Sequence, residues 1–215
     1  MNGRLIGWGL FVAILSTLSF VDRFSGNRPA KNVAYDYGTS ASAGVFYLVL
    51  FGLVMLVTYG VERRTFLGFR RPASWPRAAG ISALVVLAIM VVSGVVAQYA
   101  NAPQEQGLVP TYWDSHHIAQ FAAYAAIVAG LGPIVEELTF RGVGYGLLER
   151  YGRTFAVIVV GLAFALIHGL VEGFPIIATF GIGLTYLRAK TGSIYPCILL
   201  HACFNGAALA LGVAT

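Results

Sequence analysis

Residues 118–148 read IAQFAAYAAIVAGLGPIVEELTFRGVGYGLL, an apolar run whose only charged side chains are those of Glu136, Glu137 and Arg141. As a helix that continues to Glu149, the run would be about 48 Å long, which is more than one simple crossing of a bilayer requires. Pro133 lies inside the run and is expected to kink or break the helix. The stretch therefore predicts a long, kinked membrane helix with three charged residues directly after the kink.

The composition of the whole chain agrees with a membrane protein. Its 215 residues are 58% hydrophobic and 11% charged, with a mean hydropathy of +0.76. A soluble domain is close to half apolar and a quarter charged, and a disordered chain is more polar still, so both classes are excluded. The formal net charge is +5, but Lys and Arg fall in short gaps between apolar runs rather than on one face, so no nucleic-acid partner is predicted.

The remaining apolar runs predict an all-α fold, a polytopic transmembrane bundle of about seven helices in which the long kinked helix is the fourth. We expect one membrane domain over residues 1–215, with a motif-bearing core at about 118–212. The first run is interpreted as an uncleaved span rather than a signal peptide, because no small-x-small cleavage site follows it. The predicted helices are Leu5–Val21, Ala43–Val61, Ala78–Ala100, Ile118–Leu148, Thr154–Leu170, Phe174–Ala189 and Ile194–Gly212.

The basic residues predict how the bundle is oriented. Arg23, Arg28 and Lys31 fall on one side of the predicted spans, and ten Lys and Arg fall on the other. By the positive-inside rule, the N-terminus and the arginine-rich turns are cytoplasmic, and the C-terminus near Thr215 is outside. Tryptophans are expected in interfacial belts, among them Trp8, Trp75 and Trp113. The ten residues of the basic side are Arg4, Arg63, Arg64, Arg70, Arg71, Arg77, Arg150, Arg153, Arg188 and Lys190.

Charged side chains at bilayer depth need a partner or a function. Inserting each such side chain at the centre of a membrane helix costs about 2.5–3.5 kcal/mol on insertion scales. Glu137 and Arg141 are four residues apart, which places them on one helix face as an ion pair. Glu136 points about 100° away from Glu137 and is not neutralised by that pair. We therefore expect Glu136 to have a functional role.

Three further polar residues are expected near Glu136. Counted from the turn at Tyr151-Gly152, Glu136 and His168 lie about 22–25 Å along antiparallel neighbouring helices, so the two side chains are level. His201 and Asn205 share one face of the last helix at a comparable depth. Each has an ordinary structural explanation alone, as a satisfied histidine or an interhelical hydrogen bond. Four polar groups converging from three helices predict a site in the membrane.

These residues resemble the motifs of a known family, the CPBP intramembrane endopeptidases, which include the CAAX proteases and the Abi bacteriocin-processing proteins. Glu136-Glu137-Leu138-Thr139-Phe140-Arg141 matches E-E-x-x-x-R, Phe164 to His168 matches F-x-x-x-H, and His201 to Asn205 matches H-x-x-x-N. The resemblance extends from about Gly132 to Gly206. Three motifs in order on successive helices are specific for the family, although they do not identify a substrate.

The resemblance implies a glutamate-dependent intramembrane peptidase without a cofactor or metal. Glu136 with His168 would activate a water, His201 and Asn205 would donate hydrogen bonds to the oxyanion, and Glu137 would hold Arg141 in a supporting role. The implied partners are membrane lipids and a peptide or protein substrate, with membrane-associated and lipid-modified substrates included. The implied location is the bacterial cytoplasmic membrane. Water must reach these groups, so we expect a wet cavity that opens to the cytoplasm or laterally to lipid.

Two other interpretations stay open at this point. His and Glu are also zinc ligands, so a zinc metallopeptidase is an alternative, although no H-E-x-x-H spacing is present. The second is a non-catalytic transporter or partner-binding membrane protein that uses the polar cluster as a proton relay. Transporters usually show repeated halves with interrupted helices in corresponding places, and only one interrupted helix is predicted here.

Overall fold

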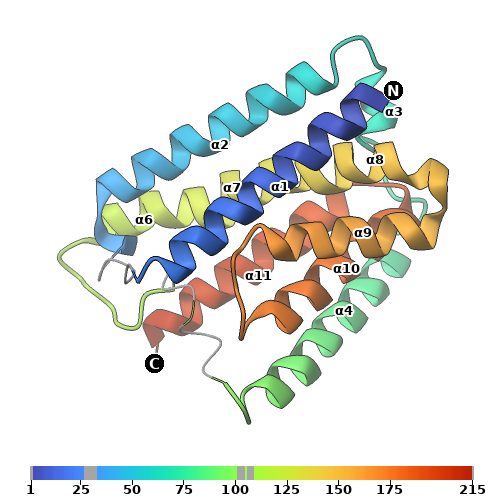
Figure 1. Ribbon diagram of the computed structural model, residues 1–215. Coiled ribbons are helices and arrows are strands. Elements are labelled where there is room, and N and C mark those ends of the chain that lie inside the picture. The colour runs from blue at the N-terminus through green and yellow to red at the C-terminus, as the bar shows by residue number, and fades with distance from the viewer. Residues whose placement is uncertain (1, 27–32, 101–104, 106–108, 215) are drawn as a thin grey trace.

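The computed structural model describes residues 2–26, 33–100, 105 and 109–214, and the regular secondary structure in these ranges is entirely helical (Figure 1). This confirms the predicted all-α class. Arg28, Lys31 and Thr215, which were used to predict the orientation, lie outside the described residues. The seven predicted helices correspond to seven observed ones, which are α1 (Asn2–Phe24), α2 (Tyr37–Val57), α4 (Trp75–Val96), the joined helix Ile118–Tyr151, α9 (Arg153–Leu166), α10 (Phe174–Thr191) and α11 (Tyr195–Ala214).

Five of these helices are long and apolar enough to cross a membrane, namely α1, α2, α4, the joined helix and α11. The protein is therefore an integral membrane protein by composition and architecture. The other two, α9 and α10, pack side by side (Figure 1). A helix of 14 residues such as α9 is about 21 Å long, which is shorter than the roughly 30 Å hydrocarbon core.

The joined helix runs from Ile118 to Tyr151 without a break, and it contains two π-helical segments. The first, η2, ends at Leu131, two residues before Pro133, which has no backbone N–H to donate. The wider π turn accommodates the proline without ending the helix. The consecutive segments are α6 (Ile118–Ala126), η2 (Ile127–Leu131), α7 (Gly132–Glu137), η3 (Leu138–Gly144), α8 (Tyr145–Leu148) and the 3₁₀ turn η4 (Glu149–Tyr151).

Glycines allow α9 and α10 to approach each other closely. A Cβ atom at Gly181 would lie 2.4 Å from the carbonyl oxygen of Gly161, so no larger residue fits without a shift. Small residues commonly permit such close backbone contact between membrane helices. The contact leaves Phe164 and Phe180 fully buried next to it, and both rings belong to the site described below.

The basic connections meet at one end of the bundle, where the N-terminus lies beside α3 (Arg63–Phe66) and α8 (Figure 1). Arg4 donates a hydrogen bond to the Tyr59 carbonyl at 2.8 Å, and Arg70 donates one to the Gly192 carbonyl at 2.7 Å. We call this the arginine end. At the opposite end, Arg23 forms an ion pair with Glu105 at 2.9 Å.

The predicted interfacial position is wrong for one of the three tryptophans. Trp75 and Trp113 are about half exposed, but Trp8 is buried in the main core. The indole N–H of Trp8 donates a 3.1 Å hydrogen bond to the Thr139 carbonyl in η3. A buried indole needs such a partner, and the carbonyl on the joined helix supplies it.

Candidate active site

A cavity of about 930 Å³ brings the predicted polar residues together. The joined helix contributes Glu136, the turn after α9 contributes His168, and α11 contributes His201 and Asn205. The cavity is therefore lined by polar groups from all three helices on which the motifs lie. The rest of its lining is mainly apolar, as in pockets that bind organic molecules.

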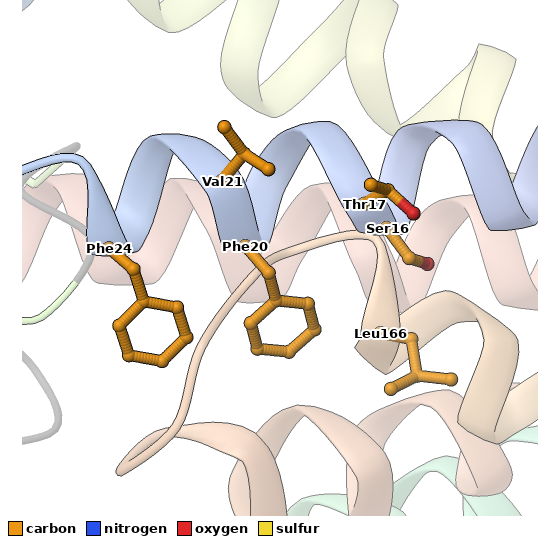
Figure 2. A pocket seen from close by; sticks show the side chains of 6 residues that line it. All are labelled: Ser16, Thr17, Phe20, Val21, Phe24 and Leu166. Carbon is orange, nitrogen blue, oxygen red and sulfur yellow. The ribbon is translucent and has the colours of Figure 1, made fainter.

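A second hollow, of about 520 Å³, lies between α1 and the end of α9 (Figure 2). Its lining is apolar apart from two hydroxyl groups, and it holds none of the motif residues. The hollow therefore offers no acid or base for catalysis. Its lining residues are Ser16, Thr17, Phe20, Val21, Phe24 and Leu166.

Glu137 is fully buried, and its carboxylate accepts hydrogen bonds from two side chains. Its Oε1 atom accepts hydrogen bonds from Arg141 Nη1 at 3.0 Å and from His201 Nδ1 at 2.8 Å. The predicted pair of Glu137 with Arg141 is present, and the bond to His201 adds to it. Arg141 also donates from Nη2 to the Gly181 carbonyl at 2.8 Å, so this pair ties the joined helix to both α10 and α11.

His201 lies between the two adjacent glutamates. With its Nδ1–H directed at Glu137, its Nε2 atom faces Glu136 Oε2 at 3.7 Å. Glu137 thus fixes the ring through Nδ1 and leaves Nε2 facing the cavity, where it can donate a hydrogen bond when both ring nitrogens carry a hydrogen.

Glu136 points into the cavity, where 13% of its side chain is exposed. The Tyr47 hydroxyl on α2 donates a 2.6 Å hydrogen bond to Glu136 Oε1. The absence of a side chain at Gly132 makes room for it, because a Cβ there would lie 2.9 Å from the Tyr47 ring. Sequence reasoning missed Tyr47. A tyrosine inside an apolar span was the available signal, because a buried phenol requires a polar partner.

His168 follows the last turn of α9, and its ring is oriented by the backbone. Nδ1 lies 2.7 Å from the Phe164 carbonyl. A carbonyl can only accept, so Nδ1 carries the hydrogen and a neutral ring has its lone pair on Nε2. Among the described residues, no direct hydrogen bond joins His168 to Glu136, although both line the same cavity.

Asn205 contacts the joined helix through its amide. Nδ2 donates a 2.8 Å hydrogen bond to the Val128 carbonyl in η2. The amide has a second N–H and an oxygen, and the side chain lines the cavity. The bond to η2 therefore fixes the orientation of the amide and leaves a donor for another group.

Phe164, the first residue of the F-x-x-x-H motif, packs against three of the polar side chains. The Arg141 guanidinium lies 4.4 Å from the centre of its ring, a cation–π contact. The His168 ring lies 4.7 Å away, and the His201 ring meets it edge-on at 5.6 Å. A fully buried phenyl ring thus fixes the relative positions of the basic groups.

Within the part of the chain that the structure describes, no group of three His, Cys, Asp or Glu side chains is placed to hold a metal ion. The zinc interpretation therefore finds no ligand set in these residues.

Comparison with known proteins gives one match to a family model. Residues 118–207 match the family model described as Rce1-like, type II CAAX prenyl endopeptidase Rce1-like. The match covers all three motifs and agrees with the resemblance to the CPBP family drawn from them. Neither the curated proteins nor the solved structures give a match.

Proposed function

We propose that the protein hydrolyses peptide bonds inside the membrane with a water activated by Glu136 and His168, because residues 118–207 are similar to the Rce1-like type II CAAX prenyl endopeptidases. The observation that carries this proposal is the position of Glu136. Its carboxylate is held by Tyr47, lines a large cavity together with His168, and takes no part in the Glu137–Arg141 ion pair.

The reaction follows from the groups that face the cavity. Glu136 takes a proton from a water while the water oxygen adds to the carbonyl carbon of the substrate. The tetrahedral intermediate then collapses, the C–N bond breaks, and the proton passes to the leaving nitrogen. The lone pair on His168 Nε2 would hold the water in line, because it can accept the second hydrogen of that water.

The oxyanion of the intermediate needs donors that are already in place. His201, oriented by Glu137, and the second N–H of Asn205, oriented by Val128, are the candidates in the cavity. Donors fixed in this way commonly lower a barrier by about 3–4 kcal/mol. Because their orienting bonds exist before substrate binds, little reorganisation is required during the reaction.

The proposal includes the location of the enzyme. The arginine end would lie in the cytoplasm of a bacterial cell, with the N-terminus on the same side, by the positive-inside rule. The single membrane domain over residues 1–215 and the core at 118–212 remain predictions.

The test is a comparison of membrane peptides in the native host. Cells that carry Glu136→Gln should accumulate a precursor that wild-type cells process, and the matching product should disappear. Glu149→Gln is the matched control, because Glu149 is an exposed glutamate on the same helix. Processing that continues unchanged in Glu136→Gln would remove the proposed base, and an identical change in the Glu149→Gln control would make the effect non-specific.

A further inference from the structure

The cavity extends from the site toward one end of the bundle only. From Glu136 and His201 its lining continues to Asp22, Gly173 and Gly212. Asp22 is two residues from the end of α1, Gly173 precedes α10, and Gly212 is two residues from the end of α11. Among the described residues, none of the connections at the arginine end, 58–74, 149–153 and 192–194, contributes to the lining.

Between the site and the arginine end the protein is tightly packed. Leu67 is fully buried against η3, where a Cβ at Gly142 would lie 2.7 Å from its side chain. Trp8 packs in the same way on Gly144, where a Cβ would lie 2.6 Å from its ring. Ile194 is also fully buried beside Gly142. These contacts leave no opening for a peptide on that side.

The two ends of the bundle differ in charge. The arginine end has ten Lys and Arg and two acidic residues, Glu62 and Glu149. At the other end the described residues include one Lys or Arg, which is Arg23, and five acidic residues. By the positive-inside rule the arginine end faces the cytoplasm, so the cavity opens away from it. The five acidic residues are Asp22, Asp36, Glu105, Asp114 and Glu172.

We infer that the active-site cavity opens to the extracytoplasmic side of the membrane, and that its substrates are exported or membrane-anchored polypeptides whose apolar segment enters from that side. This rests on the proposed function. The apolar part of the lining supports an apolar segment, since side chains such as Leu18, Phe46 and Ile176 surround the approach to Glu136. The sequence predicts an opening to the cytoplasm or laterally to lipid. The cytoplasmic opening cannot be combined with both this cavity and the predicted orientation.

Two matched alanine positions test this inference. Ala208 lines the cavity one turn beyond Asn205, and Ala73 is exposed in the connection at the arginine end. Ala208→Cys and Ala73→Cys would each be made in a background in which both natural cysteines, Cys197 and Cys203, are alanine. Intact cells are treated with a membrane-impermeant maleimide, and a second sample is treated after permeabilisation.

We expect Ala208→Cys to be labelled in intact cells and Ala73→Cys only after permeabilisation. Labelling of Ala73→Cys in intact cells would overturn the orientation. An Ala208→Cys that reacts only after permeabilisation, or not at all, would overturn the extracytoplasmic opening. Because labelling needs no turnover, it separates this inference from the proposed peptidase activity.

The proteomic comparison of Glu136→Gln cells supplies a second readout. Bonds cut only in wild-type cells should lie in segments on the extracytoplasmic side of the membrane or in the outer half of a span. Cut sites in cytoplasmic segments would contradict the inference while leaving the peptidase itself established. Failure of the proposed function would appear differently, as an absence of any Glu136-dependent cut.

Discussion

His201 donates from Nδ1 to Oε1 of Glu137 at 2.8 Å, so the second glutamate of the E-E-x-x-x-R motif orients an imidazole as well as an arginine. The sequence suggested only the pair with Arg141. The additional bond makes Glu137 the shared partner of the H-x-x-x-N helix and of the joined helix. It also turns the opposite nitrogen of His201 toward Glu136.

Glu137→Ala and Arg141→Ala should each lower stability together with activity. Both side chains are completely buried, and removal of one leaves the other charge unpaired, which typically costs about 3–5 kcal/mol. The measurement is the yield and thermal midpoint of monodisperse protein in detergent, with exposed Glu149→Ala as control. Normal yield with only turnover lost in Glu137→Ala would indicate that Glu137, rather than Glu136, has the catalytic role.

Glu136→Gln and His168→Ala should abolish cleavage and leave the protein in the membrane. The glutamine keeps the size of the side chain and its hydrogen bond from Tyr47, but it cannot take a proton from water. Turnover of the precursor identified in the host is measured alongside membrane localisation. Cleavage retained by either variant would exclude that residue from activation of the water.

Tyr47→Phe should reduce turnover without loss of fold. It removes the 2.6 Å hydrogen bond that positions the Glu136 carboxylate and leaves the ring in its place against Gly132. Hydrogen bonds to charged groups contribute about 1.5–3 kcal/mol, so we expect kcat to fall roughly 10- to 100-fold with KM little changed. Tyr59→Phe, at an exposed position, is the control. A change in KM alone would show that Tyr47 binds substrate instead.

The sequence predicted the parts of the fold and site that depend on local spacing. Apolar runs located the seven helices, and the spacing of four predicted the Glu137–Arg141 pair. The shared depth of Glu136 and His168, counted from the turn at Tyr151-Gly152, stays a prediction, although both residues line one cavity. The bonds of Tyr47 to Glu136 and of Asn205 to Val128 join residues 89 and 77 positions apart. Such contacts depend on which faces of distant helices meet, which helical periodicity alone does not specify.

The same limit explains two differences in detail. Trp8 was expected at the membrane interface because its side chain suits that location, but a carbonyl in η3 and the space over Gly144 place it in the core. Pro133 predicted a kink correctly, but the π turn of η2 that absorbs it has no separate sequence signal. The position of Trp8 thus follows from packing between helices rather than from the residue itself.

Asn205→Ala should lower turnover with little change in substrate affinity. The substitution removes a donor that would stabilise the oxyanion, an interaction made mainly in the transition state, so kcat should fall by about 100-fold or more. It also removes the bond to Val128, so the thermal midpoint must be measured in parallel. If affinity alone changed, the oxyanion assignment would be wrong.

Glu105 should make the stability of the protein sensitive to acid. It lies outside the membrane spans, and its carboxylate accepts hydrogen bonds from the backbone N–H groups of Val171 and Gly173 in the α9–α10 turn. Burial alone would raise the pKa of Glu105, but the hydrogen bonds from Gly173 and Val171, together with Arg23, outweigh it and hold that pKa below the ordinary value of 4.5.

A carboxylate with a lowered pKa in the folded state stabilises that state above the unfolded pKa, and the contribution is lost as the pH falls through the folded pKa. Glu105→Gln should therefore have a lower thermal midpoint than wild type at neutral pH, and the difference should shrink as the pH falls below the ordinary pKa of 4.5 and through the lower pKa of folded Glu105. Glu149→Gln, exposed at the arginine end, is the control. A difference that stays constant across that range would mean that the charge of Glu105 does not hold the turn, and that the glutamine variant loses stability through packing alone.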